Sequence, residues 1–399
     1  MKETMGQMPA LVYVDEANTP WVHRWLHSQS NRQATLLAKP AALPVAQALA
    51  TQYPHVQNVV SIADPGELGS HELHLPCAVP TYRFDLFPQE RCPDLDSLLP
   101  LLQNFHSLGI EHFHFHGPTG EFSIQIPSLL HEFKNRHEGQ RCFIVGNGPS
   151  LNDIDMTLLN DEITFGSNRC YLGYENWGFP FTYWGIADEY QAHSHAHEYA
   201  QHIPADTEKF CPLRYLPLLG MAKLTPVQIG PVAGQRHFSA TEPLGAGHSV
   251  THMLLQIAVA MGCNPIILVG MDHNYELCES KTSQLTRDLR ESIMRPLRST
   301  FLYHAIRTWR EAKGKDSPML PQSGPGLWDA SLAKGNTHFS DAYTQEGEHK
   351  FALPQPRESE KDYDHANTVT RNQGIKILNA TPGSQLKSFE NVSFDSLFS

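Results

Sequence analysis

The 399-residue chain lacks the features that define several common classes of protein. Its seven cysteines are scattered without a Cys-x-x-Cys pair, and no apolar leader follows Met1, so we expect a reducing, cytoplasmic location. The most apolar stretch, residues 253–270, is interrupted by Gln256, Asn264 and Pro265, which favours a buried helix and strand over a transmembrane segment. A formal net charge of −12 argues against nucleic acid as a partner.

The most informative segment is the sequence CFIVGNGPS at residues 142–150. Its apolar half predicts a buried parallel strand, and its second half predicts a tight glycine turn at the carboxyl end of that strand. Ligands of open α/β sheets bind at this end. Glycines there allow backbone N–H groups to approach an anion, and a helix that starts behind them favours negative charge. The segment therefore predicts a site for a phosphate-bearing ligand.

Two familiar nucleotide motifs are missing from this segment. The turn has no Gly-Lys-Ser/Thr ending, which excludes the P-loop, and Leu151 stands where the dinucleotide fingerprint has its third glycine. The next predicted strand, residues 163–166, is followed by Asn168, whereas nicotinamide enzymes usually carry an acidic residue there. We therefore expect Asn168 to contact a ribose or base in another way. On the glycine turn alone, a turn without any ligand is the alternative.

The chain length and the order of the patterns predict two α/β domains. Residues 1–138 form the smaller one, with strands expected at 11–14, 34–37, 59–62 and 110–116, helices at 20–28 and 95–108, and a connecting helix at 121–137. Residues 139–399 form a Rossmann-like domain with a mostly parallel sheet, strands expected at 142–145, 163–166, 181–186, 265–269 and 375–378, and a helix at 250–261. A helical insertion is expected at about 277–335; its first half is rich in arginine, which suits either phosphate binding or a solvated helix.

Two groups of histidines could bind a metal but are better explained without one. Residues 112–116 alternate His and Phe, which predicts a strand with a phenylalanine core face. His193 and His197 are spaced for one helix face, but His195 between them indicates a solvent-exposed helix. We therefore expect no metal site.

Four blocks carry a resemblance to a known superfamily: VGNGPSL at 145–151, TFGSNR at 164–169, GHSVT at 247–251 together with GMD at 270–272, and ILNATPG at 377–383. In this order they resemble the MptE-like superfamily, which includes archaeal 6-hydroxymethylpterin diphosphokinases and the motility accessory factor glycosyltransferases. They also resemble bacterial CMP-sialic acid-dependent sialyltransferases. The resemblance extends from residue 141 to the C-terminus and does not include the first domain.

The resemblance implies roles for residues at strand ends and at one helix start. It implies that the donor's phosphate and ribose contact Gly146, Asn147, Gly148 and Ser150, that its nucleoside contacts Asn168, and that its phosphate contacts Ser249, Thr251 and Tyr275. Asp272 would stand at the mouth of the site, and His338 would be the general base, with His248 and His273 as the next candidates.

The resulting hypothesis is a cytoplasmic nucleotide-dependent transferase without a tightly bound cofactor. We expect glycosyl transfer from a CMP-activated nonulosonic sugar to a small-molecule, glycan or protein acceptor. The first alternative is an ATP-dependent 6-hydroxymethylpterin diphosphokinase, in which Mg²⁺ would be held near Asp272 and Asp188. The second alternative is a nucleotide-binding module without catalytic activity.

Overall fold

The protein is described by a computed structural model, which divides into two compact units, residues 1–127 and 128–399. Our sequence analysis placed the division at 138/139. The structure describes residues 10–14, 19–28, 34–38, 40–61, 72–76, 102–103, 106, 112–117, 120–126, 128–230, 236–274, 327–329, 337–343, 350–352 and 355–399. Within these ranges, no helix is long and apolar enough to cross a bilayer.

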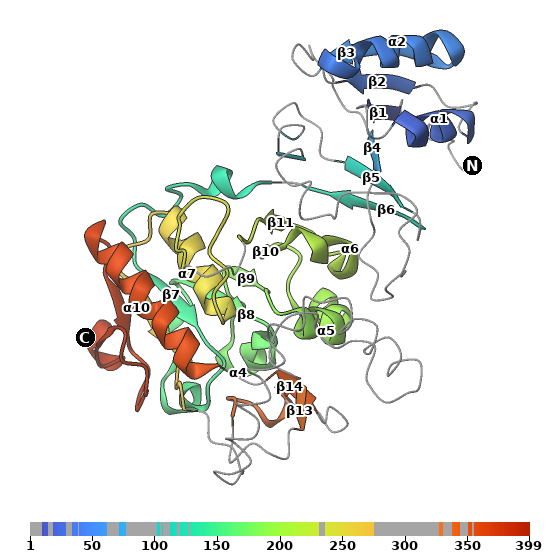
Figure 1. Cartoon of the computed structure of the whole chain (residues 1–399). Coiled ribbons are helices and arrows are strands. Elements are labelled where there is room, and N and C mark those ends of the chain that lie inside the picture. The colour runs from blue at the N-terminus through green and yellow to red at the C-terminus, as the bar shows by residue number, and fades with distance from the viewer. Residues whose placement is uncertain are drawn as a thin grey trace, which may run out of the picture. The chain divides into compact units, whose positions relative to one another are not determined.

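The first unit contains a six-stranded sheet in the order β3-β2-β1-β4-β5-β6 (Figure 1). All neighbours are parallel except β5 and β6, which form an antiparallel hairpin. The four predicted strands and the first predicted helix are present, but residues 120–125 form a strand where we expected a helix; Phe122 and Ile124 alternate there with polar residues. The elements are β1 (Ala10–Val14), α1 (Thr19–Ser28), β2 (Ala34–Ala38), α2 (Leu43–Gln52), β3 (Val56–Ser61), β4 (Glu72–Pro76), β5 (His112–Gly117) and β6 (Gly120–Gln125).

Two other predictions for this unit concern the strand of alternating His and Phe and the helix at 95–108. Phe113 of β5 is fully buried, as expected for the core face of the His/Phe strand. The side chains of the three histidines of β5 lie outside the described residues, and so does most of the helix expected at 95–108.

The second unit is built on an eight-stranded, wholly parallel sheet in the order β11-β10-β9-β8-β7-β12-β15-β16. It confirms the predicted α/β class and all five predicted strands. Three more strands, β10, β11 and β16, were not predicted. Strand β10 contains Lys209, and the edge strand β11 contains Pro226. The strands are β7 (Cys142–Val145), β8 (Ile163–Ser167), β9 (Tyr183–Gly185), β10 (Glu208–Pro212), β11 (Leu224–Val227), β12 (Ile266–Val269), β15 (Ile377–Asn379) and β16 (Glu390–Asn391).

The strand order of this sheet reverses between β7 and β12. From β7 the chain proceeds outward through β8, β9, β10 and β11, and it then returns to the other side of β7 with β12. Such a switch point is where open α/β sheets bind ligands, outside the carboxyl ends of the strands. The loops that follow β7 and β12 are therefore the first place to look for a site.

Two helices cover one face of the sheet near the switch point. The predicted helix is present as α7 (Val250–Ala260), and it packs across β7 and β8. Helix α10 (Pro356–Asn372) packs against α7 (Figure 1). Every residue of α7 from Thr251 to Ala260 is buried, because the sheet and α10 enclose it from both sides.

Candidate functional site

The glycines after β7 allow two loops to meet at the switch point. A Cβ atom on Gly146 would lie 2.3 Å from the carbonyl oxygen of Gly270, and one on Gly148 would lie 1.7 Å from Oδ2 of Asp272. Both distances are far below van der Waals contact, so only glycine fits at either position. The residues that follow, Pro149–Asp153, form a 3₁₀ turn. The helix that we expected behind the turn is therefore a short 3₁₀ helix and not an α-helix.

The backbone N–H groups of this turn are already bonded to the β12 loop. Gly146 N donates to the Val269 carbonyl at 2.8 Å, and Gly148 N donates to the Gly270 carbonyl at 3.0 Å. Ser150 donates twice to Asp272, from N at 3.2 Å and from Oγ at 2.7 Å. Burial raises the pKa of Asp272, and the hydrogen bonds from Ser150 oppose that rise. The Asp272 carboxylate thus takes the place on the turn where we expected a phosphate.

Two asparagines present unsatisfied acceptors at the ends of neighbouring strands. The Oδ1 atoms of Asn147, after β7, and Asn168, after β8, are both buried, and neither has a hydrogen-bond partner among the residues that the structure describes. Their other ends are held: Nδ2 of Asn147 donates to the Ser167 carbonyl at 3.3 Å, and the Asn168 side chain bonds Tyr343. Buried oxygens left unpaired in this way are costly, so they indicate a ligand or water that donates to them.

Asn168 adopts a backbone conformation that suits an asparagine. Its φ of 48° lies in the left-handed region, which asparagine tolerates better than most residues. Its carbonyl accepts from Nε1 of Trp184 at 2.9 Å, and its N–H donates to the Gly185 carbonyl at 3.3 Å. These bonds fix the direction of the side chain at the end of β8.

The segment 337–343 lies across the ends of β7 and β8. Phe339 N donates to the Asn147 carbonyl at 3.1 Å, and the His338 ring stacks on Tyr343 with centroids 3.8 Å apart. Burial, together with the nearby Arg169 guanidinium, lowers the pKa of His338 to about 4. His338 is therefore neutral and weakly basic near pH 7, which does not favour the role of general base that we expected for it.

Beneath this segment, the fully buried Arg169 organises a polar network. Arg169 donates to the Tyr343 carbonyl at 2.5 Å and pairs with Glu198 at 3.1 Å, and Glu198 also accepts from Tyr171. Nδ1 of His195 lies 3.3 Å from the same carboxylate. His195 is buried, so helix α5 (Glu189–His202) is not the solvent-exposed helix that we expected.

The start of α7 forms the second side of the switch point. Ser249 is the N-cap of α7: its Oγ accepts from His252 N at 3.3 Å and lies 2.7 Å from the Tyr363 hydroxyl. Thr251 Oγ1 lies 3.7 Å from Sδ of Met271 in the β12 loop. This contact brings the α7 N-terminus next to the loop that holds Asp272.

His248, just before the cap, is bound to α10. Its Nδ1 lies 2.7 Å from Oδ2 of Asp362, and its backbone N–H donates to the same oxygen at 3.0 Å. We did not predict Asp362 or Tyr363 as site residues. The available signal was their place on the buried stripe of an otherwise polar helix: Ser359, Asp362, Tyr363, Ala366 and Thr370 are its buried residues.

The remaining sequence candidates are bonded to other partners or lie outside the described residues. His273, with φ 53°, bonds Glu360 at 3.0 Å. Asp188 caps α5 by accepting from Gln191 N at 2.7 Å. Tyr275 and the arginine-rich part of the insertion lie outside the described residues. Among the residues that are described, no three His, Cys, Asp or Glu side chains are arranged to hold a metal ion.

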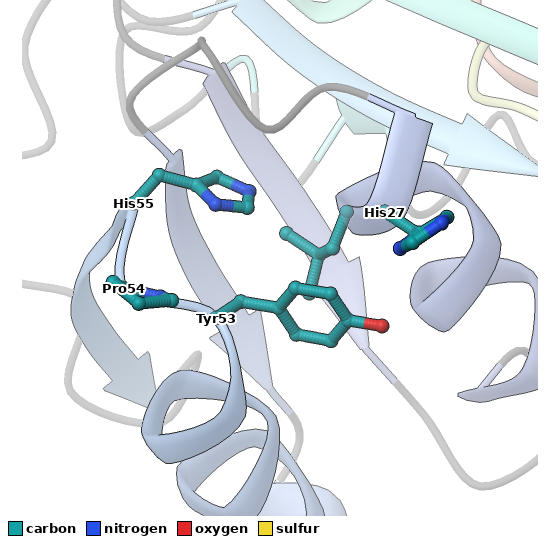
Figure 2. Close-up of a pocket in the computed structure, with 5 residues that line it drawn as sticks. His27, Tyr53, Pro54 and His55 are labelled. Carbon is teal, nitrogen blue, oxygen red and sulfur yellow. The ribbon is translucent and has the colours of Figure 1, made fainter.

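The first unit has a separate surface hollow of about 410 Å³ (Figure 2). It is formed by the end of α1 and the turn before β3, and its lining residues are Leu26, His27, Tyr53, Pro54 and His55. Both segments lead into the amino ends of parallel strands. The hollow therefore lies at the edge opposite to the one where such sheets bind ligands.

Comparison with known proteins gives one distant similarity. No family model matches the chain, and no curated protein matches it. Among solved structures, the chain is similar to the MAf glycosyltransferase from Magnetospirillum magneticum AMB-1, with 10% sequence identity and a TM-score of 0.37. The match covers 98% of this chain and 58% of that one, so the chain spans less than two thirds of that protein's length.

Proposed function

We propose that residues 128–399 form a nucleotide-dependent glycosyltransferase whose donor is a CMP-activated nonulosonic sugar. The proposal rests on the buried amide oxygens of Asn147 and Asn168 at the carboxyl ends of adjacent strands, which have no hydrogen-bond partner among the residues that the structure describes. Amide oxygens only accept hydrogen bonds, so they suit ribose hydroxyls or an exocyclic amine and do not suit phosphate. The nucleoside is therefore assigned to these two asparagines.

The phosphate is assigned to the start of α7. Asp272 already occupies the glycine turn as an anion, and a phosphate there would meet like charge. The eleven-residue helix α7 has its positive end at Ser249 and Thr251, the residues to which the superfamily resemblance gives phosphate contacts. With the phosphate at the start of α7, we assign Asn147 to the ribose. Gly146, Gly148 and Ser150 then have the role of positioning Asp272.

In such a transfer the leaving group is CMP. Charge builds up on its phosphate as the bond to the sugar breaks, and the helix start stabilises that charge. His338 is assigned to the wall of the nucleoside site, because its stacking on Tyr343 and its lowered pKa suit a neutral ring.

The diphosphokinase alternative is less well supported by the described residues. It needs carboxylates free to hold Mg²⁺ beside the phosphates. Asp272 is bound by Ser150, and Asp188 is bound as a helix cap by Gln191. Both carboxylates already have protein donors.

A panel of nucleotides tests the proposal. Thermal shifts are measured with CMP, CDP, UDP, ATP and GTP, each with and without Mg²⁺, and CMP should stabilise the protein without the metal. Stabilisation only by ATP with Mg²⁺ would instead support the diphosphokinase. Absence of a shift with every nucleotide would contradict any nucleotide-dependent reaction at this site.

Two substitutions then test the assignment of the nucleoside. Asn147→Ala and Asn168→Ala each remove one acceptor, so each should weaken CMP binding by about 2- to 13-fold, the equivalent of a net hydrogen bond of about 0.5–1.5 kcal/mol. The exposed Asn160, whose side chain bonds only to Asp161 among the described contacts, supplies the control Asn160→Ala. Calorimetry measures the three affinities. Equal CMP affinity in all three variants would show that the asparagines do not hold the nucleoside.

A further inference from the structure

The pairing of His248 with Asp362 has the geometry of an oriented base. Asp362 is 4% exposed, and its Oδ2 accepts from the backbone N–H of His248 and lies 2.7 Å from the ring Nδ1. Its Oδ1 lies 3.2 Å from Nε of Arg236. The carboxylate is therefore fixed from both sides, and it fixes the imidazole in turn.

This contact determines which nitrogen of His248 carries the proton. An ionised carboxylate only accepts, so Nδ1 of His248 must be the protonated nitrogen of the neutral ring. The lone pair then resides on Nε2, as in other histidines that a carboxylate orients. The His248 side chain is 17% exposed, so the ring is close to the surface while its partner is buried.

His248 stands where the proposed reaction takes place. It directly precedes Ser249, the cap of the helix assigned to the phosphate. From there, Thr251 contacts Met271, whose Sδ would lie 2.8 Å from a Cβ atom on Gly146. The helix start, the β12 loop and the glycine turn thus follow one another at the same edge of the sheet.

We propose that His248, positioned by Asp362, is the general base of this transferase; the inference rests on the proposed function. The acceptor hydroxyl gives its proton to Nε2, and its oxygen forms the new bond to the anomeric carbon. The bond between that carbon and the phosphate oxygen breaks, and its electron pair leaves with CMP. The imidazolium then returns the proton to solvent.

Charged groups of both signs surround the His248 ring. Asp362 and Glu358 of α10 both face the ring and stabilise an imidazolium, whereas Arg236 and the neighbouring His252 disfavour it. Burial alone would raise the pKa of Asp362, but the hydrogen bonds from His248, together with the electrostatic effects of His248 and His252, outweigh burial, and the pKa lies below its ordinary value. The carboxylate therefore remains ionised and continues to hold Nδ1–H.

The experiment measures two properties of the full-length protein: CMP affinity by calorimetry, and release of CMP from CMP-N-acetylneuraminic acid with water as acceptor. His248→Gln retains an amide that can donate to Asp362 but removes the base. Its turnover should fall by about 10²–10⁴-fold, with CMP affinity within about twofold of wild type. Asp364→Asn is the matched control, because it removes an exposed carboxylate of the same helix that has no part in the pairing of His248 with Asp362. Its turnover should stay near wild type.

Asp362→Asn tests the positioning role through the pH profile. The amide would favour the other tautomer, so turnover should fall while CMP affinity is retained. Loss of the carboxylate also destabilises the imidazolium, so the acid limb of turnover should move to lower pH; in His248→Gln that limb should disappear. If His248→Gln is poorly folded, recovery of turnover in His248→Ala with added imidazole provides the same test.

The possible outcomes are distinct. Full turnover in a folded His248→Gln protein that binds CMP overturns the role of His248 and leaves the proposed function standing. An unchanged pH profile in Asp362→Asn overturns the positioning role. A wild-type protein that neither binds CMP nor releases it from the sugar donor overturns the proposed function and the inference together.

Discussion

Replacing Gly148 with alanine should destabilise the second unit through one identifiable collision. The backbone of Gly148, with φ −72° and ψ 156°, lies in a region open to any residue, so alanine adds no backbone strain. Its Cβ, however, would lie 1.7 Å from Oδ2 of Asp272 and 2.7 Å from the Gly270 carbonyl oxygen. The Asp272 side chain must therefore rotate away from Ser150, and the backbone at Gly270 must also move.

The expected size of the effect follows from these two displacements. Overpacking of a tight contact costs about 1–3 kcal/mol. Loss of hydrogen bonds to a carboxylate costs about 1.5–3 kcal/mol each, and we discount it here because Asp272 is only partly buried. Together they predict a decrease of about 2–4 kcal/mol in the free energy of unfolding, or roughly 4–16 °C in melting temperature at about 2–4 °C per kcal/mol.

The assay is a double-mutant cycle measured by urea denaturation. Asp272→Ala alone loses the bonds to Ser150, and in that background Gly148→Ala should cost about 1–2 kcal/mol less than in the wild type, because its main collision partner is gone. Wild-type stability in the single Gly148→Ala variant would refute the reasoning. A cost that is equal in both backgrounds would show that the collision is not with Asp272.

Two further predictions concern side chains close to the site. The pKa of His338 is lowered to about 4, so between about pH 6.5 and 4 the unfolded chain binds the extra proton and the folded chain does not. Stability should therefore fall as pH decreases through that window, and His338→Gln should reduce the slope. Equal slopes for the wild type and the variant in urea denaturation at several pH values would contradict the assignment. Tyr363→Phe removes the hydroxyl that lies 2.7 Å from Ser249 Oγ, and should lower the free energy of unfolding by about 0.5–1.5 kcal/mol without loss of helix content by circular dichroism. An unchanged free energy would show that this hydrogen bond is compensated.

The parts of the fold that were predictable are those where the local pattern and the burial agree. Strands β7 and β12 are continuous apolar runs in the sequence and are buried on both faces. Strand β10 escaped prediction because it contains Lys209. The ammonium group of Lys209 donates to three backbone carbonyls, those of Ala205, Thr207 and Ala222, and burial lowers its pKa to about 8. A lysine whose ammonium group is bonded to backbone carbonyls inside the fold cannot be distinguished, from the sequence alone, from a lysine in a loop.

Only the part of the candidate site that follows β7 and β8 was predictable from the sequence. The glycine turn, Asn147 and Asn168 follow apolar runs along the chain, so their place at strand ends could be inferred. The partner of the turn could not be inferred, because Asp272 was expected at the mouth of the site and its bonds to Ser150 span 122 residues. The contact between His248 and Asp362 spans 114 residues, and it depends on how α10 packs on α7. Such contacts follow from tertiary packing and leave little trace in local pattern.

The position of β15 has a consequence for the order in which the protein can fold during synthesis. Residues 377–391 supply β15 and β16, and β12 has no partner on that side until they arrive. The same segment fixes the β12 loop: Thr381 Oγ1 accepts from Met271 N at 3.0 Å, and Ser384 Oγ donates to the Met271 carbonyl at 2.6 Å. A nascent chain that has reached residue 274 therefore exposes the apolar edge of β12, which is a template for aggregation. The switch point, and with it any chemistry there, is completed only when these late residues emerge from the ribosome.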